Sequence, residues 1–282
     1  MIILGISAFF HDSSVCLIKD GKIIAAAEEE RFTRKKHDAG FPYKAIEYCL
    51  SAAGITINAV DYISFYEKPI LKFERVMGQF IQSFPKSFFS FYQAMPSWIN
   101  DKLRVQSIIK KKLKYKKSIF FIEHHMAHAA STYLVSPFTE AAIVTIDGVG
   151  EWASTTIGHA KDNTITLDKK IDFPHSIGLL YSAVTAHLGF KVNNSEYKVM
   201  GLSAYGKPIY YDVFKKIIDI KKDGSYALDM DYFKYHYKLG MPSKKFTDAF
   251  MNVFVSKSFN LNSPFSFIVV STSSNTWINI IS

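Results

Sequence analysis

The run Ile2-Ile-Leu-Gly-Ile-Ser-Ala8, with the turn Phe9-Phe-His-Asp-Ser13 and the run Ser14-Val-Cys-Leu-Ile18, decides the fold of this chain. The two apolar runs flank a polar turn, and Lys19-Asp-Gly-Lys22 is a hairpin turn of the Asp-Gly type. A third apolar run follows at 23–27. The pattern predicts three consecutive strands joined by two tight turns.

The same pattern returns in the middle of the chain. An apolar run at 141–146 leads into Asp147-Gly-Val-Gly150, and further runs at 153–159 and 164–171 flank the polar turn 161–163. Two copies of a β-turn-β-turn-β unit predict two related α/β lobes. A ligand would then lie near the Gly-, Ser- and Asp-containing turns.

The chain between the two copies is predicted to hold helices and two more strands. Residues 42–53 are typical of a helix, because Pro42 suits its first turn and Gly54 its C-terminal end. Residues 69–109 have helical period and many aromatic residues, and we expect breaks at Pro85 and Pro96. The apolar runs 62–66 and 118–122 predict the strands.

His124 and His128 form the most informative pair of polar residues. Spaced four apart after a predicted strand, they lie on one face of a helix, where both can bind one metal ion. Asp147 stands at a strand end beside a Gly-rich turn, a usual place for a third ligand or for a phosphate contact. The alternative is that both histidines make ordinary structural hydrogen bonds.

A second polar group lies in residues 174–206. The stretch 174–189 is typical of a helix that ends at Gly189, and a turn punctuated by glycines is expected at 193–206. Glu196 and Lys198 within it are candidates for contacts to a substrate or nucleotide. The alternative is a surface ion pair, worth a few tenths of a kcal/mol.

Composition narrows the class of protein. The chain has 282 residues, 48% of them hydrophobic and 21% charged, which is typical of a globular protein with room for two lobes. The two cysteines predict buried thiols in a reducing compartment. No signal peptide or apolar run of 18 residues is evident, so we expect a cytoplasmic protein without a membrane span.

The net charge of +9 is concentrated in places, because residues 110–117 alone carry six lysines. Such a run can hold nucleic acid or an anionic membrane surface. No aromatic RNA-reading motif accompanies it, so a solvated helix end is favoured and a nucleic-acid partner is not expected. By contrast, residues 258–282 have no charged side chain. This indicates a non-native-looking tail outside the stable core, or else a buried terminal strand.

Four motifs together resemble the O-carbamoyltransferases of nodulation-factor and antibiotic biosynthesis. They cover the chain to about residue 210 and are listed in order: Ile6-Ser-Ala-Phe-Phe-His-Asp-Ser-Ser14; Ala27-Glu-Glu-Glu-Arg-Phe-Thr-Arg-Lys-Lys-His-Asp38; His124-His-Met-Ala-His-Ala129 with Asp147-Gly-Val-Gly-Glu-Trp152; and Glu196-Tyr-Lys-Val-Met-Gly-Leu202. The resemblance implies the N-terminal domain of that family, related to the catalytic subunit of the tRNA threonylcarbamoyl-transferases. It also implies a two-lobed, ribonuclease H-like ATPase fold of the actin, sugar-kinase and Hsp70 type.

The resemblance further implies a reaction. The family transfers a carbamoyl group from carbamoyl-adenylate, made from ATP and carbamoyl phosphate, to a hydroxyl of a small-molecule acceptor. Carried over, His124, His128 and Asp147 would bind Fe²⁺ or another divalent metal, and His11 would be the base that deprotonates the acceptor. The nucleotide contacts would come from four residues: Gly148, Gly150, Glu196 and Lys198.

The resemblance also indicates a truncated chain. We expect a first lobe at 1–137, an incomplete second lobe at 138–257 and the tail at 258–282, without the domain that forms carbamoyl-adenylate. An enzyme half that works with a separately encoded C-terminal half is therefore the leading hypothesis. The alternatives are a catalytically inactive fragment and a tRNA-modification subunit that uses the lysine run for RNA.

Overall fold

The computed structural model describes residues 1–238 and 240–256, with side chains described as far as residue 250. The chain divides into two compact units, one made of Met1–Met77 and Phe91–Ser131, the other of Gly78–Ser90 and the chain from Thr132 onward. The domain limits expected from the sequence stay predictions. The expected tail at 258–282 lies outside the described residues.

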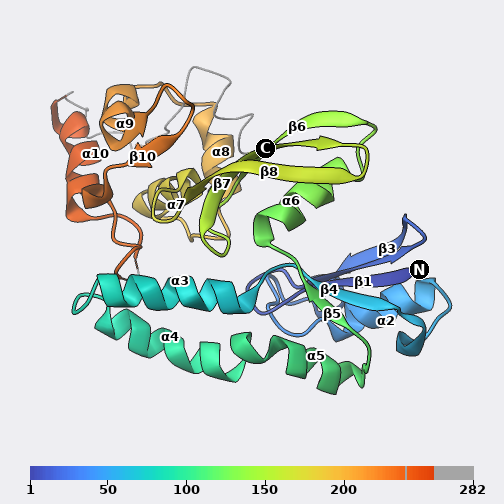
Figure 1. Cartoon of the computed structure of the whole chain (residues 1–282). Helices are drawn as coiled ribbons and strands as arrows, with labels where there is room; N and C mark the ends of the chain where they lie inside the picture. The colour runs from blue at the N-terminus through green and yellow to red at the C-terminus, as the bar shows by residue number, and fades with distance from the viewer. Residues whose placement is uncertain (239, 257–282) are drawn as a thin grey trace. The chain divides into compact units, whose positions relative to one another are not determined.

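The first unit is built on a five-stranded mixed sheet (Figure 1). Its strands are β1 (Ile2–Ser7), β2 (Ser14–Lys19), β3 (Lys22–Glu28), β4 (Tyr62–Phe65) and β5 (Ile119–Phe121). Their order is β3-β2-β1-β4-β5, in which β1, β2 and β3 are antiparallel neighbours while β4 and β5 run parallel to β1. This is the order of a ribonuclease H-like sheet, so the predicted fold class is confirmed.

The sequence alternation explains the first three strands. Leu4 pairs with Leu17 and Ile6 with Val15 across β1 and β2, and all four side chains are buried on one face. Burying a side chain of this kind contributes about 1.5–3 kcal/mol. The hairpin between β2 and β3 turns at Asp20 and Gly21, both with positive φ, as an Asp-Gly turn requires.

Helices account for most of the rest of the first unit. Helix α2 (Tyr43–Ala52) lies against β2 and β3 and adds Ala45, Ile46 and Cys49 to the core. The other helices that belong wholly or partly to this unit are α1 (Glu30–Thr33), α3 (Pro69–Gln82), α4 (Phe88–Asn100), α5 (Val105–Leu113) and α6 (His124–Tyr133), with 3₁₀ turns at Ile57–Ala59 and Lys102–Arg104.

One expected break in these helices is wrong. Pro85 lies between α3 and α4, as predicted, but Pro96 lies inside α4. A proline there leaves the carbonyl of Tyr92 without its helical donor. The helix nevertheless continues, and the buried Trp98 supports it by packing on Phe73 at 5.5 Å between ring centroids.

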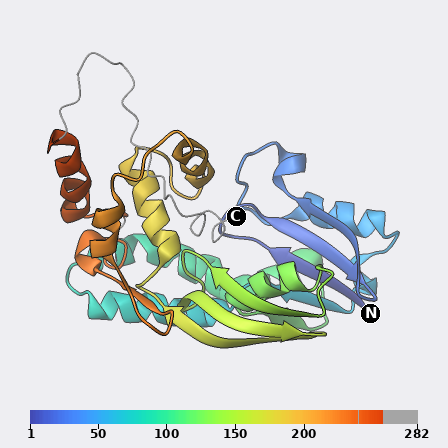
Figure 2. The ribbon, with the colours of Figure 1, turned by 90° about the horizontal axis from the view of Figure 1, so that it is seen from above.

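The second unit contains its own antiparallel meander, seen from above in Figure 2. Its strands are β6 (Glu140–Ile146), β7 (Ala153–Lys161) and β8 (Thr164–Asp172), in that order. The meander repeats the pattern of β1 to β3, as the internal duplication predicted. The remaining elements are α7 (Ile177–His187), α8 (Glu196–Ser203), α9 (Tyr211–Ile217), β9 (Ile218–Ile220), β10 (Tyr226–Leu228), a 3₁₀ turn at Met230–Tyr232 and α10 (Lys244–Ser256).

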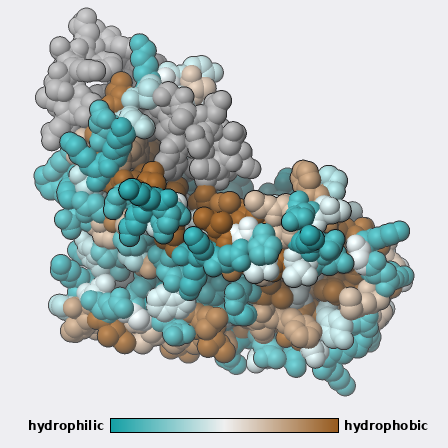
Figure 3. Space-filling model, turned by 45° about the horizontal axis from the view of Figure 1, so that its top comes forward, coloured by the Kyte–Doolittle hydropathy of each residue, from teal (hydrophilic) through white to brown (hydrophobic). Residues whose placement is uncertain are grey.

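Several aromatic rings pack together in the core of the second unit. Phe250 contacts Tyr210, Phe214 and Phe246 at centroid distances of 5.1, 5.3 and 4.6 Å. Tyr210, Phe246 and Phe250 are each no more than 2% exposed. On the face drawn in Figure 3, hydrophobic surface lies in several patches between hydrophilic side chains. None of the helices in the described part of the chain has the length and apolar character needed to cross a bilayer.

Candidate functional site

The turn after β1 places His11 within the first unit. Two backbone hydrogen bonds tie this turn to the segment 37–40, from Phe9 N to Ala39 O at 3.0 Å and from Ser13 N to Asp38 O at 2.8 Å. The Ser13 hydroxyl adds a third by donating to Gly40 O at 2.7 Å. The two loops are therefore held together by main-chain contacts on both sides of His11.

Side chains from both loops meet at Asp12. One carboxylate oxygen of Asp12 lies 2.9 Å from His11 Nδ1, and the other lies 2.9 Å from His37 Nδ1. Burial raises the pKa of the Asp12 carboxyl, but the hydrogen bonds from His37 and His11 outweigh it, so the pKa is lowered overall. Asp12 is therefore ionised at neutral pH.

The sequence motifs predicted a role for His11 but none for Asp12 or His37. Asp12 adjoins His11 in the chain, and His37 belongs to a motif quoted for the resemblance. Both residues therefore stand in quoted motifs, but the sequence does not indicate that their side chains are in contact. Arg31 and Lys35 of that motif are exposed and pair with Glu28 and Asp38. Glu30, in the same motif, accepts the backbone N–H of His37 at 2.9 Å.

His124 and His128 meet on helix α6, as their spacing predicted. Their Nε2 atoms are 3.0 Å apart and their ring planes are perpendicular. At metal–nitrogen bond lengths of about 2.1 Å, this separation corresponds to an angle of about 90° at a shared ion. The pair thus fits adjacent positions of an octahedral divalent metal. Without an ion, one imidazole donates to the other.

Asp147 belongs to the second unit, where it directly follows β6. Its backbone N–H donates to Ser154 O at 2.9 Å, and the N–H of Gly150 donates to Ala153 O at 2.9 Å, so the turn is fixed at both ends. Its role as a third metal ligand stays a prediction.

The start of helix α7 lies against the turn 147–150. Ser176 caps the helix by accepting from Leu179 N, and its hydroxyl donates toward the carbonyls of Asp147 and Gly148 at 3.0 and 2.7 Å. A Cβ on Gly178 would come within 2.4 Å of the Asp147 carbonyl oxygen. Backbone N–H groups of a helix start beside a Gly-containing turn suit phosphate oxygens, which is the role predicted for Gly148 and Gly150.

Glu196 and Lys198 lie in a helix, so the predicted turn at 193–206 is wrong for its middle part. Glu196 begins α8, and its carboxylate accepts the N–H groups of Asn193, Asn194 and Ser195 at 2.9–3.1 Å and the Ser182 hydroxyl at 3.0 Å. These bonds close the loop onto the helix start, which the glycine pattern did not reveal. Contacts of Glu196 and Lys198 to a nucleotide stay a prediction.

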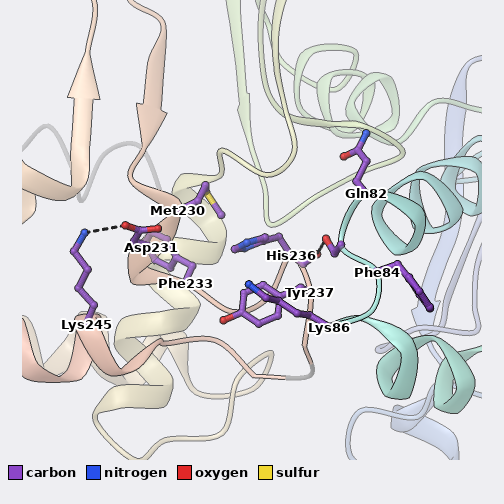
Figure 4. A pocket seen from close by; sticks show the side chains of 10 residues that line it. Gln82, Phe84, Lys86, Met230, Asp231, Phe233, His236, Tyr237 and Lys245 are labelled. Carbon is purple, nitrogen blue, oxygen red and sulfur yellow. Dashed lines mark hydrogen bonds and ion pairs between the residues drawn. The ribbon is translucent and has the colours of Figure 1, made fainter.

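A hollow of about 680 Å³ in the second unit was not anticipated (Figure 4). Its lining includes Lys86, Met230, Asp231, Phe233, His236 and Tyr237. The Lys245 ammonium at its rim pairs with Asp229 at 2.9 Å. Burial, and then the charge of Lys86, lower the pKa of His236, which keeps this imidazole neutral at pH 7. None of the site residues named from the sequence lines this hollow.

Comparison with known proteins identifies the family. The family model described as carbamoyltransferase N-terminus matches residues 2–266. The chain belongs to this family. Within it, an uncharacterized protein of Synechocystis, sll1178, is 50% identical over 257 residues, which cover 88% of this chain and 42% of that protein. Nodulation protein NolNO of Sinorhizobium fredii is 31% identical over 80% of this chain and 32% of its own length.

This member of the carbamoyltransferase N-terminus family therefore spans less than half the length of the relatives named above. Among solved structures, YeaZ of Pseudomonas aeruginosa is 15% identical, with a TM-score of 0.34 over 62% of this chain and 69% of that chain. The activator of 2-hydroxyisocaproyl-CoA dehydratase from Clostridium difficile is 11% identical, with a TM-score of 0.36 over 73% of this chain and 58% of that chain.

Proposed function

We propose that this chain is the metal-binding, N-terminal part of an O-carbamoyltransferase. The reaction moves a carbamoyl group from carbamoyl-adenylate to the hydroxyl of a small-molecule acceptor. The observation that carries the proposal is the 3.0 Å approach of His124 Nε2 and His128 Nε2 in a chain that belongs to this family. Family membership supports the reaction class, and the histidine pair supports a metal-dependent site.

Each group of residues has its own role in the proposed reaction. His124 and His128, with Asp147, would hold Fe²⁺ or another divalent ion, which when bound supplies a Lewis acid for the carbamoyl carbonyl. His11 accepts the proton of the acceptor hydroxyl, because a neutral imidazole is a competent base near pH 7. The turn 147–150 and the start of α7 would contact phosphate oxygens of the donor.

A second protein component is part of the proposal. The chain matches 42% of its Synechocystis relative, and we propose that a C-terminal half supplies carbamoyl-adenylate from carbamoyl phosphate and ATP. A cytoplasmic setting would provide both of those small molecules. In this proposal the N-terminal part depends on that half for its activated donor, because orienting the acceptor cannot replace a missing reactant.

The proposal is tested by mixing the purified chain with a C-terminal half taken from the Synechocystis relative. Carbamoyl phosphate, ATP, Fe²⁺ and a panel of sugar and aminoglycoside acceptors are added, and pyrophosphate release and product mass are followed. We expect a product heavier by one carbamoyl group in the mixture and none with either half alone. His11→Gln should abolish it.

His159→Gln is the matched control for loss of a histidine. His159 lies on β7 and pairs with Asp168, and its side chain is 61% exposed, so turnover should be retained. If no acceptor is carbamoylated when both halves and the metal are present, the proposed function is wrong. Turnover by the chain alone would show that no second half is needed.

A further inference from the structure

The contacts at Asp12 determine where the protons lie on two imidazoles. An ionised carboxylate only accepts hydrogen bonds. Both Asp12 oxygens lie 2.9 Å from an imidazole Nδ1, one of His11 and one of His37. Each Nδ1 must therefore carry the donated hydrogen. When these rings are neutral, their Nε2 atoms are bare and can accept a proton.

We infer that Asp12 is a positioning residue that holds His11 with Nδ1 protonated and Nε2 free to act as the base, and that His37 in turn holds Asp12. The inference rests on the proposed function, in which His11 takes the acceptor proton. Asp12 and His37 then support His11 in its role as the base, and neither residue has to touch the substrate.

The surroundings of His37 explain how it can hold a carboxylate from a distant loop. Its backbone N–H donates to Glu30, and the following Asp38 carboxylate accepts Gly40 N at 3.0 Å and the Thr33 hydroxyl at 3.0 Å. The next residues bind the His11 turn through main-chain hydrogen bonds. These hydrogen bonds hold the backbone of His37 in place independently of the contact between its ring and Asp12.

The chemical consequence concerns the proton in the transfer step. The acceptor oxygen bonds to the carbamoyl carbon, the bond from that carbon to the adenylate oxygen breaks, and AMP leaves. The hydroxyl proton moves to His11 Nε2, which becomes an imidazolium that still donates from Nδ1 to Asp12. The negative charge of Asp12 stabilises that imidazolium, as an aspartate does beside the histidine of a serine protease.

The test is the tautomer of His11, read by long-range ¹H–¹⁵N NMR of the ¹⁵N-histidine-labelled chain. Spectra are recorded at about pH 9, above the usual imidazole pKa of about 6.5. The His11 signals are assigned by their loss in His11→Gln. We expect Nδ1–H in the native chain. The His37 signals are assigned in the same way by their loss in His37→Asn. In Asp12→Asn the amide nitrogen replaces one of the two carboxylate oxygens and donates instead of accepting, so one of the two imidazoles, His11 or His37, should switch to Nε2–H.

Two variants at position 37, His37→Asn and His37→Ala, distinguish a loss of the hydrogen bond to Asp12 from a loss of folding. His37 has φ of +56° and Asp12 has φ of +50°, and asparagine tolerates such angles. The amide nitrogen of His37→Asn can replace Nδ1 as the donor to Asp12, so His11 should keep Nδ1–H. His37→Ala removes the donor and should give a mixture of tautomers. Unchanged signals of His125, a buried residue of the first unit, will show that this unit is folded in each variant.

Two results would overturn the inference. One is Nε2–H at His11 in the native chain, and the other is that His11 and His37 both keep their native tautomers in Asp12→Asn. The readout needs no turnover. A tautomer switch without any carbamoyl transfer in the two-half assay would therefore reject the proposed function while leaving the Asp12 contact established.

Discussion

At the scale of single residues, the histidine pair on α6 makes the sharpest prediction. His128→Ala removes one of two imidazole donors 3.0 Å apart, so the chain should lose at least tenfold in affinity for Fe²⁺ or Co²⁺. Isothermal titration and elemental analysis after dialysis will measure it. His159→Ala, on the exposed face of β7, is the control and should bind as the native chain does. Equal binding by all three proteins would reject the metal site.

Gly178 makes a second prediction at this scale. A methyl group there would meet the Asp147 carbonyl oxygen at 2.4 Å, so Gly178→Ala should move α7 away from the turn and cost about 1–3 kcal/mol of unfolding free energy. Gly201→Ala, inside α8 with nothing within 4 Å, should instead stabilise by about 1 kcal/mol. Urea denaturation distinguishes the two, and equal stability of both variants would contradict the close approach.

At the scale of elements, helix α8 depends on one carboxylate. Glu196→Ala leaves three N–H groups of residues 193–195 without their acceptor, and we expect a loss of about 2 kcal/mol. Glu47→Ala, on the exposed face of α2, should change stability by less than about 0.5 kcal/mol. Thermal unfolding measures both. A Glu196→Ala variant as stable as the native chain would leave ligand binding as the better account of this residue.

The strands of the two meanders could be predicted from the sequence, whereas α8 could not. Alternation of Leu4, Ile6, Val15 and Leu17, with an Asp-Gly turn nearby, is a local signal. The glycines near 201 and 206 favoured a turn, yet Glu196 and the packing of Val199 hold a helix there. Pro96 is a similar case, because burial of Trp98 outweighs a local helix breaker. Tertiary contacts override propensity at both places.

In the candidate site, too, local contacts could be predicted from the sequence and long-range contacts could not. His124 and His128 meet through helical spacing alone, so their contact could be predicted. Asp12 and His37 are 25 positions apart and meet because residues 37–40 run beside the turn after β1. Only the folded chain brings that carboxylate to both imidazoles.

At the scale of the whole molecule, the second unit should be sensitive to acid. Burial lowers the pKa of His175, His187 and His236, assisted by Lys221 at His175 and by Lys86 at His236. The unfolded chain takes up protons near pH 6.5, before these folded imidazoles do. Stability is therefore fully present above that pH and falls below it, by about 1.4 kcal/mol for each pKa unit of difference.

The measurement is chemical denaturation at pH 7.5 and pH 5.0, compared with His187→Phe. The His187 ring lies 5.8 Å from Phe246 and 5.6 Å from Phe250 between centroids, so phenylalanine keeps the aromatic contacts while removing the titrating group. We expect the native chain to lose more stability at pH 5.0 than the variant does. The same loss in both proteins would exclude His187 as a source of the acid sensitivity.

The two loops around His11 also limit which amino acids evolution and mutagenesis can place there. Phe9, Asp12, Arg34 and His37 all have positive φ, between +50° and +72°. Glycine, asparagine and aspartate occupy such angles readily, and β-branched residues do so rarely. Libraries randomised at these four codons should therefore return almost no isoleucine, valine or threonine, even where a side chain faces solvent. At positions 12 and 37 the positive φ and the side-chain hydrogen bonds both favour a small number of polar amino acids.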